Sequence, residues 1–150
     1  MSQSPTSRAL QWSKKRGLDA AVVERYCSWS RRKHDLFGFA DLLVLDGAPG
    51  VLAVQVTDGS NVSHRIEKMS GLASVVKWLR AGLRAEVWGW RKLAVKAKKK
   101  RKPGTKAATR WTLRRVSARL ASDGVGISWD ELGDGAGPLV DDLSGPVGGQ

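Results

Sequence analysis

The sequence predicts a small α/β or α+β domain in which helices pack against a mixed β-sheet. Two observations predict this class. The chain has 150 residues, a length that suits one domain with one modest core. Segments with helical periodicity also alternate with short β-branched segments, in the order helix, strand, strand, helix, strand, basic loop, strand. The pattern gives the class but not the order of the strands.

The first half of the chain predicts one helix followed by two strands. Segment 10–29 favours a helix, because Asp19 can cap a stretch in which apolar residues recur at helical spacing. Segments 39–45 and 51–57 are compact apolar runs, separated by the turn sequence DGAPG at 46–50. These two runs predict a hairpin that is buried on at least one face.

The second half predicts a helix and then two more strands. Segment 63–81 carries an apolar stripe at helical spacing. Segments 86–95 and 110–116 read as strands, and the lysine-rich run 96–106 between them is too repulsive to pack, which predicts a mobile basic loop. Three tryptophans are expected in the core: Trp78, Trp88 and Trp111.

Charge divides the chain into two parts. Residues 1–121 hold all 26 basic residues and eight of the 14 acidic ones, a net charge of +18, whereas 122–150 hold six acidic residues and no basic one. The second part also has eight glycines in 29 residues, which predicts a mostly disordered acidic tail after a domain at 1–121. A body this basic makes a polyanion such as DNA the default partner.

Composition excludes several classes of protein. The only cysteine, Cys27, allows neither an internal disulfide nor a cysteine-based zinc site, and we expect it to be a buried small residue on the first helix. No apolar run approaches the ~20 residues of a membrane span, and the N-terminus lacks a signal-peptide core. We therefore expect no membrane partner and a cytoplasmic location, which for a viral protein would be the host cell.

Two polar residues interrupt the two strands of the first predicted hairpin. Asp41 lies in an apolar run, where a carboxylate is costly unless it is paired or bound to a cation, and Gln55 interrupts the next strand in the same way. A hairpin would bring the two side chains together as a partial oxygen shell for Mg²⁺. The residues alone leave a second interpretation open, in which Asp41 caps a turn and Gln55 bonds to a neighbour.

These residues resemble the core of the PD-(D/E)XK nuclease superfamily, in particular its small phage-type and Holliday-junction-resolvase-like members. Ala40-Asp41, followed by a hairpin and by QVT at 55–57, corresponds to the metal-binding motif, and WGWRK at 88–92 resembles a late tryptophan-and-basic strand. The resemblance covers about 18–116. It implies a restriction-endonuclease-like core and a metal-dependent DNA endonuclease.

The resemblance also implies a metal site. Asp41 takes the first position and Gln55 the second, where glutamine is an accepted variant, and Glu24 falls on the preceding predicted helix, where an acidic residue often completes the site. The implied cofactor is Mg²⁺ or Mn²⁺. A resolvase would act as a symmetric homodimer, because two strands must be cut together.

One departure concerns the catalytic lysine of the family. Thr57 stands in its place and cannot orient or deprotonate a water molecule, so Lys68 or Lys33 would have to supply the cation. If neither does, the chain is a non-catalytic nucleic-acid-binding protein that retains the nuclease fold. The residues expected to hold DNA phosphates are Arg65, Lys92, Lys98, Lys99, Lys100, Arg101 and Lys102.

Overall fold

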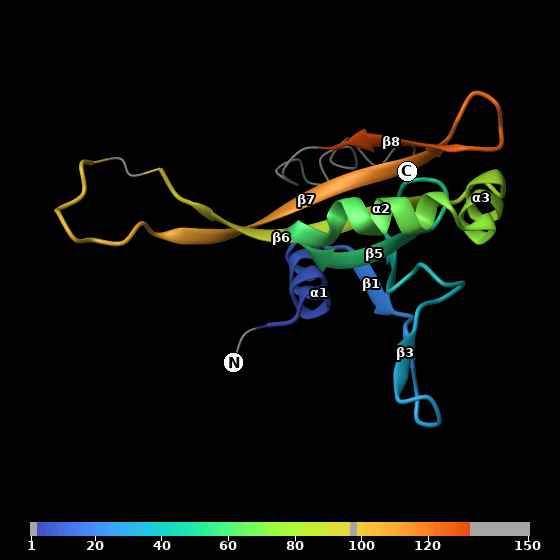
Figure 1. The fold of residues 1–150 in the computed structure, drawn as a ribbon, viewed down its shortest axis with the longest axis horizontal. Coiled ribbons are helices and arrows are strands. Elements are labelled where there is room, and N and C mark those ends of the chain that lie inside the picture. The colour runs from blue at the N-terminus through green and yellow to red at the C-terminus, as the bar shows by residue number, and fades with distance from the viewer. Residues whose placement is uncertain (1–2, 97–98, 133–150) are drawn as a thin grey trace, which may run out of the picture.

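The computed structural model describes residues 3–96 and 99–132, which form a six-stranded sheet between helices (Figure 1). The strands lie in the order β1-β4-β5-β6-β7-β8. Their bounds are β1 Asp19–Val22, β4 Leu42–Leu45, β5 Leu52–Asp58, β6 Arg84–Ala94, β7 Thr109–Leu120 and β8 Ile127–Glu131. Strands β5 and β6 are parallel and the other neighbours are antiparallel. The predicted mixed sheet with flanking helices is confirmed.

The helices cover both faces of this sheet. α1 (Pro5–Lys15) packs through Ala9 and Trp12 on one face. α2 (Val62–Ser70) and α3 (Ala73–Arg80) pack on the other, and a short 3₁₀ helix, η1 (Gly59–Asn61), leads into α2. Because helices cover both faces of the sheet, every residue of β5 except Asp58 is buried, and most of them are apolar.

Alternation along β5 decides where its polar side chains point. Val54 and Val56 belong to the cluster beneath α1, whereas Ala53 belongs to the cluster beneath α2 and α3. Gln55 and Thr57 therefore lie on the face of α2, at the end of the strand from which the chain enters η1. Both are buried, at 2% and 5% exposure.

The predicted helix at 10–29 is wrong beyond its first third. α1 ends at Lys15, and Gly17 adopts a φ of +70°, which reverses the chain. Asp19–Val22 then pairs with β4 as an edge strand, so a tertiary contact overrides the helical spacing. Glu24 accordingly lies in the link after β1 rather than on a helix.

The chain then forms a separate two-stranded hairpin. It consists of β2 (Arg25–Cys27) and β3 (Arg32–His34), paired antiparallel. Cys27 is half-buried on β2, so its predicted place on an apolar helix face is also wrong.

The predicted strands at 86–95 and 110–116 are confirmed as β6 and β7, which form a long arm beyond the body (Figure 1). The predicted helix at 63–81 is confirmed with a break between α2 and α3 at Gly71 and Leu72, which leaves the apolar spacing almost unchanged. Trp88 is buried and Trp78 is half-buried against Phe39.

The core prediction for Trp111 is wrong. Its side chain is 40% exposed and lies between Arg8 and Lys92, whose charged groups are 3.7 and 5.2 Å from the ring centroid. These are cation–π contacts at the base of the arm. Arg8 belongs to α1, so this helix covers only part of the ring.

The start of the predicted acidic tail belongs to the sheet. Residues 127–131 form β8, which pairs with β7, and Arg119 and Arg114 bind Asp130 and Glu131 at 2.6 and 2.8 Å. The prediction of disorder is therefore wrong for this stretch, because its acidic side chains meet the arginines of the neighbouring strand. Residues 133–150 lie outside the described residues. Within the described part of the chain, no helix has the length and apolar character needed to cross a membrane.

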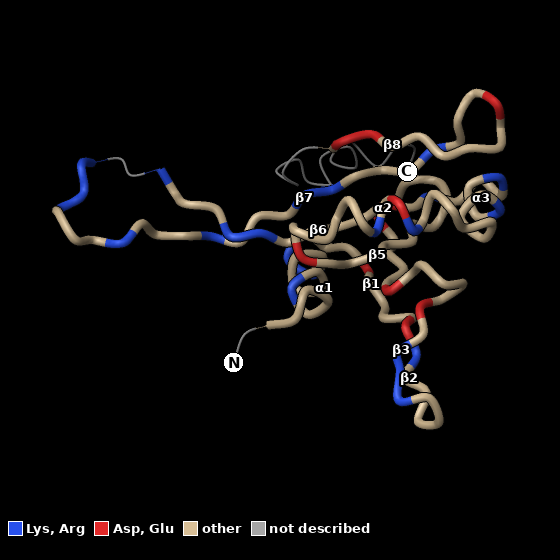
Figure 2. Tube along the Cα trace, viewed as in Figure 1, with Lys and Arg blue, Asp and Glu red and all other residues tan. Residues whose placement is uncertain are grey.

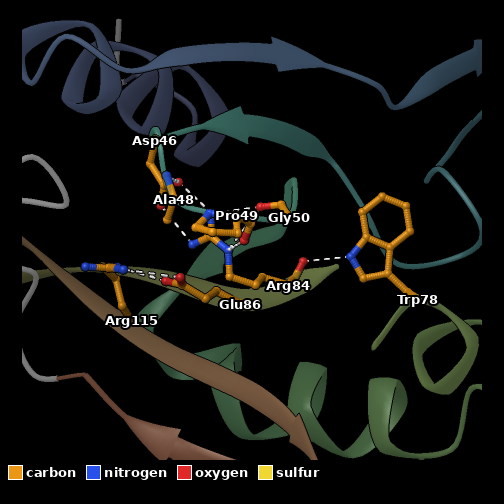
Figure 3. Close-up of polar contacts among 8 residues, drawn as sticks. All are labelled: Asp46, Ala48, Pro49, Gly50, Trp78, Arg84, Glu86 and Arg115. Atoms are coloured by element: carbon orange, nitrogen blue, oxygen red, sulfur yellow. Dashed lines mark hydrogen bonds and ion pairs between the residues drawn. The ribbon is translucent and has the colours of Figure 1, made fainter. Parts of the chain in front are cut away.

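Two ion pairs link the strands, and in each of them the carboxylate is buried (Figure 3). Arg84 of β6 donates to Asp46 and to the carbonyl oxygens of Pro49 and Gly50, which fixes the turn between β4 and β5. Arg115 of β7 binds Glu86 of β6 through two hydrogen bonds of 2.8 and 3.2 Å. Both acids serve the structure of the sheet.

Candidate functional site

Asp41 is held at the start of β4 by its own backbone and by β5. Its N–H donates to the carbonyl oxygen of Val54 at 2.9 Å, and its Oδ2 accepts from the backbone N–H of Val56 at 2.8 Å and from Gln55 Nε2 at 2.6 Å. The side chain is 5% exposed. The predicted contact between Asp41 and Gln55 across the hairpin is confirmed.

Two further carboxylates join Asp41. Glu24 and Asp35 each offer a carboxylate oxygen, and these atoms and one of Asp41 all lie within 4.8 Å of one another. The carbonyl oxygen of Asp41 accepts from the N–H groups of Val23 and Glu24, at 2.9 and 3.3 Å, and so places Glu24 beside it. Three oxygens this close form a cluster that can hold a divalent cation.

Sequence analysis missed Asp35. The residue follows β3, and the small hairpin of β2 and β3 returns it to the side of Glu24. Because segment 10–29 carried helical spacing, nothing indicated that the chain would turn back between the two acids. The sequence offered one signal for Asp35, which is that a single acidic residue directly follows the basic run 31–34.

Burial, a hydrogen bond with Asp35 and the negative charges of Asp35 and Glu24 together raise the pKa of the Asp41 carboxyl to about 7, whereas the Val56 N–H acts in the opposite direction. The repulsion between a buried carboxylate and its acidic neighbours is removed when the carboxylate binds either a proton or a cation.

This shift predicts how stability without metal depends on pH. Asp41 has an ordinary pKa of 3.8 and a folded pKa of about 7, so the folded state binds more protons than the unfolded state between these values. The proton on Asp41 should therefore stabilise the folded state in EDTA, and this stabilisation should decrease as the pH rises from about 4 to about 7. Urea titrations across this range, compared with Asp41→Asn, measure it; identical slopes in both proteins would contradict the assignment.

Gln55 leaves one polar atom without a partner. Its Nε2 is used by Asp41, but its Oε1 is buried and has no hydrogen bond among the described residues. A buried acceptor without a donor is unfavourable by about 1–3 kcal/mol. An amide oxygen is also a ligand for hard cations, so this atom adds to the oxygen set of the cluster.

The cluster and Gln55 line an open cavity of about 520 Å³. The cavity lies between the start of α1, the end of β5, α2 and the base of the small hairpin. Thr57, which the resemblance aligns with the catalytic lysine of the nuclease superfamily, lines it as well. The cavity is large enough to admit a phosphodiester group together with water.

Cations border the same cavity. Lys68 Nζ lies 3.7 Å from Asp35 Oδ2, Lys33 Nζ lies 3.3 Å from Glu24 Oε1, and Arg65 is a further lining residue. The structure therefore brings to one place both lysines that sequence analysis offered as replacements for the missing one. Each lysine side chain is well exposed, at 39% and 68%, so each can change partner.

The other expected DNA-binding residues lie apart from the cavity. Lys92 is on β6 beside Trp111, and 99–102 are exposed in the loop at the far end of the arm. Figure 2 shows basic residues along this arm, which projects away from the body. Lys98 lies outside the described residues. The structure thus divides the expected contacts between Arg65 at the cavity and an extended basic arm.

Comparison of the chain with protein-family models, with curated proteins and with solved structures finds no match. The site and its chemistry therefore rest on the geometry described above.

Proposed function

We propose that this chain is a Mg²⁺-dependent DNA endonuclease with a restriction-endonuclease-like core. The observation that carries the proposal is the cluster of Glu24, Asp35 and Asp41 beside the unpartnered Oε1 of Gln55, in a cavity bordered by cations. Asp46, an acid with a structural role, is neutralised by the guanidinium group of Arg84, which binds it through two hydrogen bonds. The three acids of the cavity instead share two exposed lysines, which leaves them deficient in positive charge.

The oxygen set fits Mg²⁺ or Mn²⁺. Asp41, Glu24 and Gln55, the residues that the resemblance implies, would hold the ion together with Asp35. When bound, the ion would supply positive charge for the transition state of phosphodiester hydrolysis. Hard cations prefer carboxylate and amide oxygens, which are the donors present, and the cavity offers neither a thiolate nor an imidazole.

We assign to Lys68 the role of the catalytic lysine that Thr57 replaces. Its ammonium group reaches the carboxylate cluster from α2, and Thr57 presents no charge there. An ammonium at this place would orient a water molecule toward a bound phosphate and stabilise developing negative charge. Lys33, which binds Glu24, would perform the same task if Lys68 holds the DNA backbone instead.

The basic arm would bind the DNA backbone on either side of the cut. The loop residues carry no acidic neighbour, since 91–110 contains no Asp or Glu, so their charges are available to phosphates. Such contacts position an enzyme on DNA without selecting a base sequence.

Replacing the four loop residues by glutamine should weaken the salt dependence of DNA binding. Each lost phosphate contact is expected to reduce the slope of log affinity against log salt by about 0.9. The variant is Lys99→Gln, Lys100→Gln, Arg101→Gln and Lys102→Gln, measured by anisotropy with duplex DNA in EDTA. The control is Lys77→Gln with Arg80→Gln on α3, at the end of the molecule opposite the arm (Figure 1), which should leave the slope unchanged. Equal slopes for the parent and the loop variant would remove the arm from the interface.

The decisive experiment is a cleavage assay with branched, duplex and single-stranded DNA in Mg²⁺, in Mn²⁺ and in EDTA. Hydrolysis that requires the metal supports the proposal. DNA binding without hydrolysis in either metal would favour the alternative, a non-catalytic binding protein, for which the replacement of the usual lysine by Thr57 is the specific observation.

A further inference from the structure

The small hairpin projects from the body (Figure 1), and Lys33 on its second strand lines the cavity. It comprises β2, β3 and the turn at 28–31, with pairs running from Arg25↔His34 to Cys27↔Arg32. Glu24 directly precedes it and Asp35 directly follows it, so the hairpin rises from two members of the carboxylate cluster. Any ligand of the cavity that is larger than a nucleotide must therefore pass close to this hairpin.

The tip of the hairpin exposes a large aromatic side chain. Trp29 is 97% exposed, the highest value among the large apolar side chains that the structure describes. Its turn is held by a hydrogen bond of 3.2 Å between Ser30 Oγ and His34 Nε2. Backbone N–H groups of Ser30 and Trp29 bond to the Cys27 sulfur and lower the pKa of its thiol. Trp29 is thus presented to solvent by an ordered turn, which is unfavourable for an indole ring unless a ligand covers it.

The charge of the hairpin indicates what that ligand is. Its ten residues include four exposed cations and no acid: Arg25, Arg31, Arg32 and Lys33. Figure 2 shows this basic segment ending at the acidic residues of the cavity. Exposed aromatic rings among arginines and lysines suit a polyanion whose bases stack on rings, which is a nucleic acid strand.

The register places a second aromatic ring between the tip and the cavity. Tyr26 is 62% exposed and lies directly opposite Lys33, so the two side chains share one face of the hairpin. Lys33 lines the cavity and binds Glu24, which identifies that face as the one toward the cluster. Trp29 comes five positions after Glu24, at most about 16 Å of extended chain, which matches about five nucleotides of DNA.

We propose that Trp29 stacks on an unpaired base of DNA that is bound at the cavity, so that the preferred substrate class is DNA in which a duplex meets unpaired nucleotides. This inference rests on the proposed function. A base within an intact duplex already stacks on both neighbours, so a ring can cover it only after unstacking it. A base at a junction, flap or bulge is free to accept the ring, and the hairpin therefore favours such sites.

The test measures binding in EDTA, without cleavage, to a duplex with an unpaired bulge and to the same duplex without it. The parent should prefer the bulged DNA, and Trp29→Ala should weaken that binding by about 5- to 150-fold, the range for one stacked base, with little effect on the plain duplex. Trp29→Phe should retain most of the preference. Val125→Ala, at another exposed apolar residue, should change neither affinity. A fluorescent adenine analogue in the bulge should be quenched by the parent but not by Trp29→Ala.

Four results would overturn the inference. Equal affinity for both DNAs in the parent, or an unchanged preference in Trp29→Ala, would leave the proposed function intact and remove Trp29 from recognition. A change of Trp29→Ala from dimer to monomer in solution, with unchanged DNA binding, would assign the ring to a second copy of the chain. Failure of the parent to bind either DNA would instead reject the proposed function together with the inference.

Discussion

Asp41→Asn is expected to lower the rate of DNA cleavage by at least about 100-fold, while the fold and DNA binding persist. Asparagine is nearly isosteric, and its Oδ1 can still accept from Val56 N–H and Gln55 Nε2. Its amide N–H groups can donate to the neighbouring carboxylate of Asp35. The substitution therefore removes a metal ligand and a charge without removing the hydrogen bonds that place the residue.

Stability separates this interpretation from a structural one. Without metal and above about pH 7, the variant should be as stable as the parent or more stable, because a buried charge beside two other acids is gone. Mg²⁺ at ten times its Kd should stabilise the parent by about 1.4 kcal/mol and the variant not at all. If Asp41 only caps the turn, the variant should lose stability and neither protein should respond to Mg²⁺. Melting curves with Mg²⁺ and with EDTA measure all four cases.

Asp46→Asn is the matched control. Asp46 is equally buried, at 4% exposure, but Arg84 neutralises it and it lies outside the cavity. This variant should lose stability in EDTA and keep both cleavage and the response to Mg²⁺. Parent-like cleavage by Asp41→Asn would show that the metal is held elsewhere.

The central hairpin was predictable because its signals are local. The turn sequence between two apolar runs fixes the pairing of β4 with β5, and that pairing alone brings Asp41 to Gln55. The same locality explains the success with β6 and β7, whose strands flank a run too basic to pack. Where two strands that are neighbours in sequence also pair in space, alternation and turn residues are sufficient to predict the pairing.

The remainder of the site depended on contacts between distant segments. Residues 19–22 have apolar spacing that suits a helix, but they pair with the edge of β4 and form a strand. The chain after this strand forms the small hairpin, and the hairpin brings Asp35 back beside Glu24. The third carboxylate thus follows from an edge strand that no local pattern indicated.

The buried ion pair between Glu86 and Arg115 also joins residues distant in sequence, so no local pattern indicated it (Figure 3). Glu86 Oε1 accepts from Arg115 Nε at 2.8 Å and from Trp88 Nε1 at 3.0 Å. Both charged side chains are at most 7% exposed. Each charge is therefore stabilised chiefly by the other.

Arg115→Met should accordingly destabilise the protein by about 3–5 kcal/mol, because Glu86 would remain buried with only the indole N–H as a donor. A loss of this size is a large part of the 5–15 kcal/mol by which a domain is typically stable. Urea unfolding at neutral pH measures this loss.

The neighbouring arginine provides the control for this last prediction. Arg114 binds Glu131 at 2.8 Å with the same geometry, but both side chains are partly exposed, at 31% and 48%. Arg114→Met should therefore cost no more than about 1 kcal/mol. Replacing both members of the buried pair by apolar residues, Glu86→Leu with Arg115→Met, should cost less than Arg115→Met alone, because no charge is left without a partner. Equal losses for Arg114→Met and Arg115→Met, or additive losses in the double variant, would show that burial does not determine the contribution of this pair.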